Sequence, residues 1–175
     1  MHITKATPTD IPELNRLINS AYRGETSKQG WTTEAEILDG IRINEETLAT
    51  YFEQSNVSIL KCSNEVGEII GTVYLELNTP KLYLGMFAVS PFVQGKGIGK
   101  MLMKAAEEFA LSHHCDRIAI SVISNRAELI EWYMRHGYQA TGHSIAFEEI
   151  ENRFGDPKID EIRLISMEKL LVQFS

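Results

Sequence analysis

The chain has 175 residues, of which 43% are hydrophobic and 23% are charged, and its formal net charge is −7 at pH 7. This length and composition predict one soluble globular domain that covers residues 1–175. The negative charge argues against a nucleic-acid backbone as the main partner, because phosphate binding needs a basic stripe. Two distant cysteines, Cys62 and Cys115, and the lack of metal-ligand spacing predict reduced thiols, no bound metal and a cytoplasmic location. We also expect no secretory signal, because the first residues are polar, and no membrane span, because no apolar run approaches ~20 residues.

The first half of the chain predicts helices followed by strands. In chain order, periodicity and turn residues predict a strand over 2–6, helices over 7–22, 35–39 and 45–54, and strands over 57–62, 69–78 and 82–90. The first helix is indicated by Leu14, Leu17 and Ile18 at helical spacing. The helix over 35–39 is indicated by a capping box of Thr33 with Glu36. The strand over 82–90 is nearly all apolar, which indicates a central place in the sheet.

The second half of the chain begins with a glycine-rich loop and returns to alternating helices and strands. It predicts a helix over 98–114, a strand over 117–124, a helix over 127–137 that ends at Gly137, and strands over 138–149 and 161–171. The early strands are expected to pair antiparallel, and the strand–loop–helix–strand order in the middle predicts a crossover. The fold class is therefore α/β with a mixed sheet of about six or seven strands flanked by helices.

The glycine-rich loop lies in the stretch "SPFVQGKGIGKMLMKAAEEFA", residues 90–110. Gly95, Gly97 and Gly99 recur at every second position and lead directly into a helix. The dinucleotide fingerprint G-x-G-x-x-G fails because Lys100 stands at its last glycine. The P-loop pattern fails at both its first glycine and its hydroxyl position.

The loop is nevertheless typical of an anion site. A strand end, flexible glycines and a helix N-terminus let backbone N–H groups converge on phosphate oxygens. Gly95 and Gly97 would allow the backbone to approach a pyrophosphate closely, and Lys96 and Lys100 add local positive charge. An ordinary strand-to-helix turn with solvated lysines is the alternative interpretation.

Two motifs resemble a known family. "QGKGIG", residues 94–99, matches the pattern Q/R-x-x-G-x-G/A directly after a strand, and "ELIEWYMRHGYQATG", residues 128–142, carries a tyrosine and a closing Gly-Tyr. Together they resemble the acetyl-CoA-binding core of the GNAT superfamily of N-acetyltransferases. The resemblance implies a GNAT-like fold, acetyl-CoA as co-substrate without a metal, and acetyl transfer to a primary amine by direct attack in a ternary complex. The acceptor would be a small-molecule or peptide amine, and the protein a monomer or homodimer.

The same resemblance implies roles for individual residues. The backbone of Phe87, Ala88 and Val89 would pair with the pantetheine arm of CoA, and one N–H of this strand would polarise the thioester carbonyl. The pyrophosphate would be held by the loop and the helix start, namely Gln94, Gly95, Lys96, Gly97, Ile98, Gly99 and Lys100.

Tyr133 matches the superfamily tyrosine that protonates the departing CoA thiolate. A phenol with a pKa of ~10 can donate a proton to a thiolate whose conjugate acid has a pKa of ~8.5. Packing of Tyr133 in the core beside Trp132 is the alternative interpretation.

The sequence departs from the family pattern at three places. Many members carry an asparagine seven residues before this tyrosine, where the chain has Arg126, and Asn125 stands one position earlier. Either residue is a candidate for contact with the CoA arm. The two positions of the family's glutamate bases hold Tyr83 and Ser121. Glu76, Glu34 and a chain of water molecules therefore remain as candidates for the general base.

The acceptor is expected under a lid formed by residues 21–34, with Tyr22, Arg23 and Trp31 near the amine. The alternatives are a packing contact for Trp31 and surface solvation for Arg23. The acidic segment 147–156 is a second expected rim, which would favour a cationic amine. A non-catalytic CoA-binding sensor or interaction module is the alternative function, and a longer acyl group or a hydroxyl acceptor also stays open.

Overall fold

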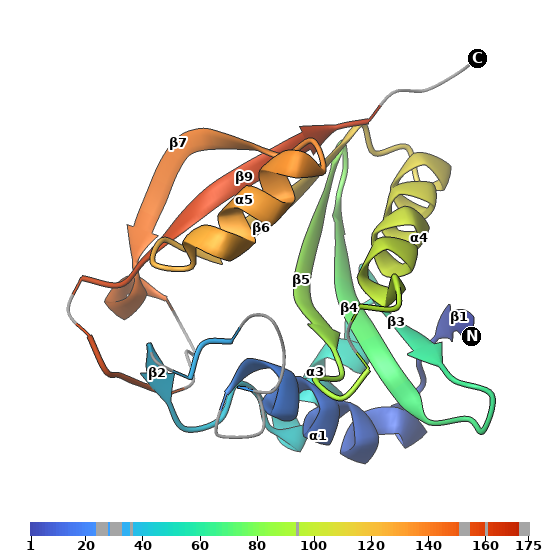
Figure 1. Ribbon diagram of the computed structural model, residues 1–175. Coiled ribbons are helices and arrows are strands. Elements are labelled where there is room, and N and C mark those ends of the chain that lie inside the picture. Colours follow the sequence, from blue (N-terminus) through green and yellow to red (C-terminus); the bar gives the residue numbers. More distant parts are fainter. Residues whose placement is uncertain are drawn as a thin grey trace.

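The structure is a computed structural model that describes residues 1–23, 28, 33–35, 37–93, 95–150, 155–159 and 161–171 (Figure 1). Its helices are α1 (Ile11–Tyr22), α3 (Glu45–Glu53), α4 (Ile98–Ser112) and α5 (Ala127–Arg135). Its strands are β1 (His2–Lys5), β2 (Leu38–Asp39), β3 (Val57–Ser63), β4 (Ile69–Asn78), β5 (Lys81–Val89), β6 (Arg117–Ile123), β7 (Gln139–Ala146), β8 (Asp156–Pro157) and β9 (Arg163–Leu170). No helix of the described part is both long and apolar enough to cross a membrane.

Seven strands form one mixed sheet in the order β1-β3-β4-β5-β6-β9-β7. Every neighbouring pair is antiparallel except β5 and β6, which are parallel and joined through α4. The predicted mixed sheet of six or seven strands, the antiparallel early strands and the central position of β5 are therefore confirmed.

The helix expected over 35–39 is wrong. The hydroxyl of Thr33 accepts the backbone N–H of Ala35 at 3.0 Å, and the N–H groups of Ile37 and Leu38 both bond to the carbonyl of Glu34, which is the pattern of a turn. Glu36, the other half of the expected capping box, lies outside the described residues. The chain then enters β2, which pairs antiparallel with β8. The partner strand lies far along the chain, so the local capping pattern carried no sign of it.

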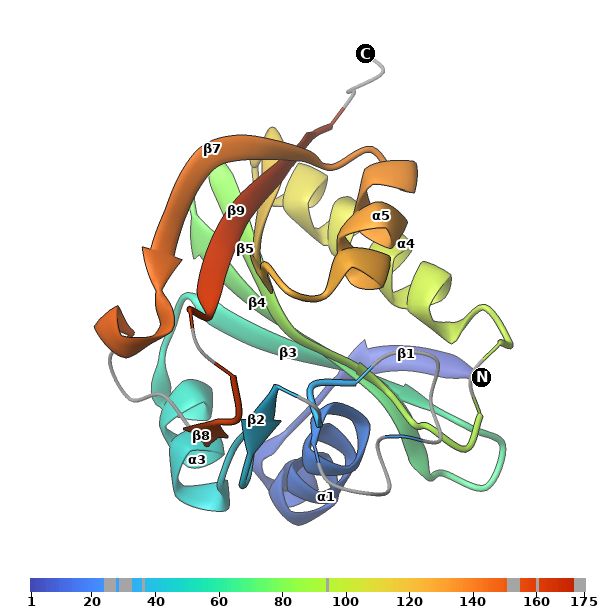
Figure 2. The same cartoon turned by 60° about the vertical axis from the view of Figure 1, so that its left-hand side comes forward.

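The helices cover both faces of the sheet (Figure 2). On one face, α4 contributes Ile98, Leu102, Met103, Ala106 and Ala110 to a core that also contains Tyr133 of α5. On the other face, α1 and α3 pack Leu14, Leu17, Ile18 and Leu48 against β3, β4 and β5. The apolar spacing that predicted the first helix thus corresponds to its buried side.

β5 contains one extra residue relative to β4. The register runs from Tyr74↔Gly85 to Thr72↔Ala88, so β4 advances two residues while β5 advances three. Met86, at this bulge, has a φ of +44°, in the left-handed region that non-glycine residues rarely adopt.

β5 and β6 separate soon after they begin. Their pairing covers only Lys81↔Arg117, Leu82↔Ile118 and Tyr83↔Ala119, although β5 continues to Val89. Figure 1 shows the two strands diverging, with α4 following β5 and α5 following β6. The divergence opens the sheet at the carboxyl end of both strands.

Gly71 of β4 allows α4 to lie close to the sheet. A Cβ atom at this position would stand 2.9 Å from both Ile98 Cγ2 and Leu102 Cδ1. We expect Gly71→Ala to lower the free energy of unfolding by about 1–3 kcal/mol through overpacking, measured by urea denaturation. The double variant Gly71→Ala/Leu102→Ala should lose less than the sum of the two single losses. Strict additivity would contradict the proposed contact.

Candidate active site

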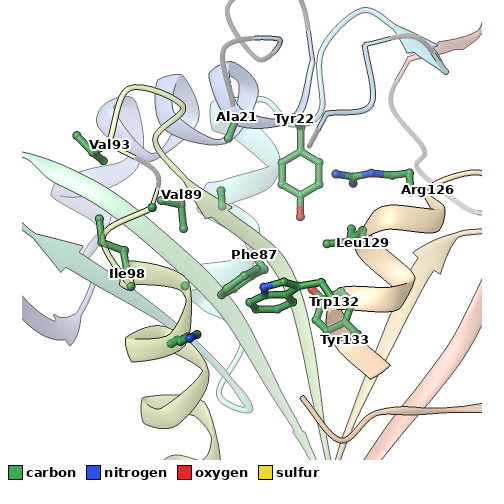
Figure 3. Close-up of a pocket in the computed structure, with 15 residues that line it drawn as sticks. Ala21, Tyr22, Phe87, Val89, Val93, Ile98, Arg126, Leu129, Trp132 and Tyr133 are labelled. Atoms are coloured by element: carbon green, nitrogen blue, oxygen red, sulfur yellow. The ribbon is translucent and has the colours of Figure 1, made fainter. Parts of the chain in front are cut away.

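A cavity of about 340 Å³ lies where α4 begins, between β5 and α5 (Figure 3). Its lining comes from the end of α1, the end of β5, the glycine loop with the start of α4, and α5 with its N-cap. The lining residues are Ala21, Tyr22, Phe87, Ala88, Val89, Val93, Gly95, Gly97, Ile98, Gly99, Lys100, Arg126, Leu129, Trp132 and Tyr133. The rings of Phe87 and Trp132 lie together at its centre, with their centroids 6.0 Å apart. We call this the first cavity.

The glycines of the loop have different physical roles. Gly95 and Gly97 have φ values of +86° and +76°, which suit glycine because it lacks a Cβ atom. No described atom lies within 4 Å of the Cβ position at either residue. At Gly99 a Cβ atom would stand 3.3 Å from Phe87 Cζ, so this glycine permits close packing of the helix start on β5.

The start of α4 directs backbone donors toward the first cavity. Gly97 is the N-cap, and its carbonyl accepts the N–H of Met101 at 3.0 Å. The N–H groups that precede Met101 lie in the first turn, where a helix has no intrahelical acceptors for them. Together with the helix dipole, this arrangement favours an anion at the loop.

Tyr133 lies on α5 and lines the first cavity. Its side chain is only 5% exposed, and Trp132 and Tyr138 meet its ring edge-on at centroid distances of 5.3 Å each. Burial raises the pKa of Tyr133 well above its ordinary value of 10.0. The hydroxyl therefore keeps its proton at neutral pH and can act as a proton donor.

A second cavity of about 270 Å³ lies on the other side of Tyr133. It shares Tyr22, Phe87, Arg126, Leu129 and Tyr133 with the first cavity. Its remaining lining comprises Arg23, Glu34, Arg42, Tyr51, Tyr83, Leu84, Gly85, Met86, Ile120, Ser121, Val122, Ile123, Phe147, Ile150 and Leu164. Two cavities that share a wall with a proton donor can hold two reactants next to each other.

A buried ion cluster forms part of the second cavity. Glu34 Oε1 lies 3.2 Å from Arg23 Nε, and Glu34 Oε2 lies 3.1 Å from Arg126 Nη1. Each of the three side chains is at most 7% exposed, and Arg23 also donates to the carbonyl of Ile41 at 2.5 Å. Arg23 is therefore buried rather than solvated, and both oxygens of Glu34 accept hydrogen bonds from guanidinium groups.

The structure brings most of the expected site residues together. Those that line one or both cavities are Tyr22, Arg23, Phe87, Ala88, Val89, Gly95, Gly97, Ile98, Gly99, Lys100 and Tyr133. Lys96 is exposed and does not line the first cavity, and Trp31 and Gln94 lie outside the described residues.

Asn125 and Glu76 lie away from both cavities. Asn125 is exposed and its side-chain oxygen accepts the hydroxyl of Ser124 at 3.2 Å, whereas Arg126 lines both cavities. Glu76 accepts hydrogen bonds from the hydroxyl of Tyr74 at 2.7 Å and from the amide of Asn78 at 2.8 Å, and lines a separate pocket.

Several residues that line the cavities were not predicted from the sequence. Leu129 stands three residues after Arg126 and four before Tyr133, and Trp132 stands three after Leu129, so helical spacing could have indicated both. Arg42 lies in the loop before α3 and carries no motif, so no local signal was available for it. Within the part of the chain that the structure describes, no three His, Cys, Asp or Glu side chains gather to hold a metal ion.

Comparison with known proteins identifies the class. The sequence matches the model of the acetyltransferase (GNAT) family over residues 13–138, and the chain belongs to this family. The crystal structure of a ribosomal-protein-alanine N-acetyltransferase from Brucella melitensis superposes with a TM-score of 0.70 at 20% identity, covering 98% of this chain and 100% of that one. The fold is therefore the GNAT fold.

Curated relatives match over shorter segments. A spermine/spermidine N(1)-acetyltransferase of Bacillus subtilis (strain 168) is 35% identical over 63 residues, which cover 35% of this chain and 41% of the relative. A mycothiol acetyltransferase of Tsukamurella paurometabola is 24% identical over 152 residues, which cover 82% of this chain and 50% of the relative. The chain thus spans half or less of the length of these two relatives.

The glycine loop yields a direct test. We expect Gly97→Ala to raise the Kd for CoA at least ~5-fold, because a Cβ atom at a φ of +76° costs about 1–2 kcal/mol and shifts the start of α4. Isothermal titration calorimetry with CoA measures the change. Gly67→Ala is the matched control, because Gly67 has a φ of +86° and equally open surroundings in the turn between β3 and β4. Equal loss of CoA affinity in both variants would contradict a specific role of the loop.

Proposed function

We propose that residues 1–175 form one acetyltransferase domain that transfers an acetyl group from acetyl-CoA to a primary amine. Both substrates would be bound at once, and the amine would attack the thioester directly. The observation that carries this proposal is the position of Tyr133 in the wall between the two cavities. Membership of the GNAT family, whose enzymes use acetyl-CoA, supports it independently.

The first cavity suits the CoA end of the donor. The backbone N–H groups near Gly95, Gly97 and the first turn of α4 would bind the pyrophosphate, with Lys100 adding positive charge at the rim. β5 continues beyond its pairing with β6, and the pantetheine arm would lie along this part of the strand. The rings of Phe87 and Trp132 offer an apolar surface beside that arm.

In the proposed complex the acetyl group passes from the sulfur of CoA to the amine nitrogen in one transfer step. Acetyl-CoA supplies a thioester, a carbonyl carbon with a good leaving group. The neutral amine nitrogen forms a bond to this carbon, the carbon–sulfur bond breaks, and Tyr133 donates its proton to the departing sulfur. The amine loses a proton to water, and a proton returned from solvent restores the Tyr133 hydroxyl. Holding the two reactants in line supplies a large part of the rate gain.

The proton of the acceptor ammonium most readily leaves through water. Glu34 is the carboxylate that lines the second cavity among the described residues, and both of its oxygens are engaged by arginines. Glu76 lies outside both cavities. We therefore assign deprotonation to water that is continuous with bulk solvent, which was one of the three candidates from the sequence.

Tyr133→Phe tests the proton donor. We expect it to lower amine-stimulated thiol release by about 10²–10⁴-fold while the Kd for CoA changes less than about threefold, because only the proton donor is removed. Thiol release from acetyl-CoA over a panel of amines measures the rate, and calorimetry measures the Kd.

Tyr138→Phe is the matched control for this substitution. The ring of Tyr138 packs against the ring of Tyr133. Its hydroxyl is buried and has no hydrogen-bond partner among the described residues, so removal of this hydroxyl should leave activity intact. Equal rates in wild type and Tyr133→Phe would contradict the assigned role. CoA binding without thiol release for any amine would instead favour a non-catalytic CoA-binding module.

The pH profile gives a second test. Because burial raises the pKa of Tyr133 well above 10.0, the donor stays protonated throughout the neutral and mildly alkaline range. We expect kcat/KM to rise with pH as the amine loses its proton, up to the amine's own pKa of about 10, without a decline on the way. Mass spectrometry of the acetylated amine measures this without interference from the thiol reagent. A descending limb with an apparent pKa below about 9 would contradict the role of a buried neutral Tyr133.

A further inference from the structure

We propose that the acceptor is a small amine that also carries a carboxylate, and that Arg42 binds this carboxylate in the second cavity. The inference rests on the proposed function and specifies the chemical class of its acceptor. It follows from the charges that line the second cavity and from the way Arg42 is held there.

The described charges of the second cavity are predominantly positive. Three arginines, Arg23, Arg42 and Arg126, line it together with one carboxylate, that of Glu34. The described lining therefore carries an excess of two positive charges, although the whole chain carries a net charge of −7. Positive charge concentrated in a partly closed cavity attracts an anion, because the low-dielectric walls screen it poorly.

Glu34 is engaged by two of the three described arginines. Its two oxygens bind Arg23 and Arg126, and no ion pair joins it to Arg42. Burial lowers the pKa of Arg23, Glu34 opposes this effect, and the nearby charge of Arg42 lowers that pKa further. Arg42 therefore adds positive charge at short range to a cluster whose carboxylate is already engaged by the other two arginines.

Arg42 is held in place by α1. The side-chain oxygen of Asn19 accepts the backbone N–H of Arg42 at 2.6 Å and that of Ile43 at 3.1 Å, and the amide of Asn19 donates to the carbonyl of Ile43 at 3.0 Å. The guanidinium carbon lies 5.2 Å from the centroid of the Tyr22 ring, within the range of a cation–π contact. A half-buried arginine that is preorganised in this way suits bidentate binding of a carboxylate.

The volume of the second cavity and its apolar lining residues limit which group the acceptor can carry besides its amine and carboxylate. A volume of about 270 Å³ is at the small end for small-molecule sites. Phe147, Ile150 and Leu164, which belong to one hydrophobic cluster, add apolar surface to the lining. An amino acid with an apolar side chain meets both requirements, whereas a polyamine would place several positive charges beside three arginines.

The experiment compares acceptors that differ in the carboxylate. Phenylalanine, leucine and methionine would each be assayed against the corresponding amine without the carboxylate and against the corresponding amide, with spermidine as the polycation. The amine is more basic than the amino acid and the amide is less basic. A preference for the amino acid over both therefore cannot arise from amine basicity. We expect kcat/KM to be at least ~10-fold higher for at least one of these amino acids than for both of its counterparts.

Arg42→Met tests the assigned residue. It should lower kcat/KM for the preferred amino acid about 10- to 100-fold while leaving turnover of the counterparts without a carboxylate and the KM for acetyl-CoA within about twofold. Arg42→Lys should recover part of the loss, because it restores the charge but not the bidentate geometry. Arg16→Met, on the exposed side of α1, is the matched control and should behave as wild type.

The outcomes separate this inference from the proposed function. Acetylation of spermidine or of the decarboxylated amines at rates equal to or above those of the amino acids would overturn the carboxylate requirement and leave the transferase intact. An equal loss for all acceptors in Arg42→Met would overturn the role of Arg42. Failure to acetylate any amine, with CoA bound, would contradict the proposed function itself.

Discussion

The extra residue in β5 is the constraint on which the site depends. Inserting one residue into a strand exchanges the faces of all side chains that follow. Leu84, before the bulge, packs in the core beneath α4, whereas Met86 and Ala88, after it, pack in the core beneath α1. Phe87 consequently turns toward α4 and lines the first cavity. A residue at φ +44° costs about 1–3 kcal/mol, and the buried Met86 side chain helps to offset this cost.

The separation of β5 from β6 is the second feature that shapes both cavities. α5 follows β6 away from β5 (Figure 1). Tyr133 therefore reaches the first cavity from one side, and Tyr22, at the end of α1, reaches it from the other (Figure 3). The ion cluster of Arg23, Glu34 and Arg126 joins the segment after α1 to the start of α5, because Glu34 and Arg126 are 92 residues apart in the sequence. Buried ion pairs add little net stability, but a broken one is costly, so the cluster favours one arrangement of the segments around the cavity.

The parts of the site that the sequence predicted are those with local causes. Helical spacing, the glycine loop at the start of α4 and the tyrosine of α5 are each encoded within a few neighbouring residues. The place of Arg42 in the second cavity could not be predicted in this way, because its backbone is held by Asn19, which lies 23 residues away. β2 was missed for the same reason, since its partner is β8.

The choice between Asn125 and Arg126 has a simple geometric basis. Seven residues correspond to about two turns of helix, so the side chain seven positions before Tyr133 points in nearly the same direction. That residue is Arg126, the N-cap of α5, which lines both cavities, whereas Asn125 stands one position further from the helix and is exposed. The position relative to α5 therefore favours Arg126 over Asn125 for the proposed contact with the CoA arm.

The positive charge of the second cavity is also related to the lack of a glutamate at the two positions where family members carry a carboxylate base. A neighbouring positive charge disfavours an ammonium group, so arginines close to the acceptor nitrogen lower the pKa of a bound amine. A carboxylate on the same acceptor would be held by Arg42, which compensates for the repulsion of the ammonium group. In the proposed complex one set of charges would thus anchor the acceptor and promote loss of its proton to water. A glutamate in place of Tyr83 or Ser121, both of which line this cavity, would partly cancel that effect. The lack of an acidic residue at these two positions is therefore consistent with an acceptor that brings its own negative charge.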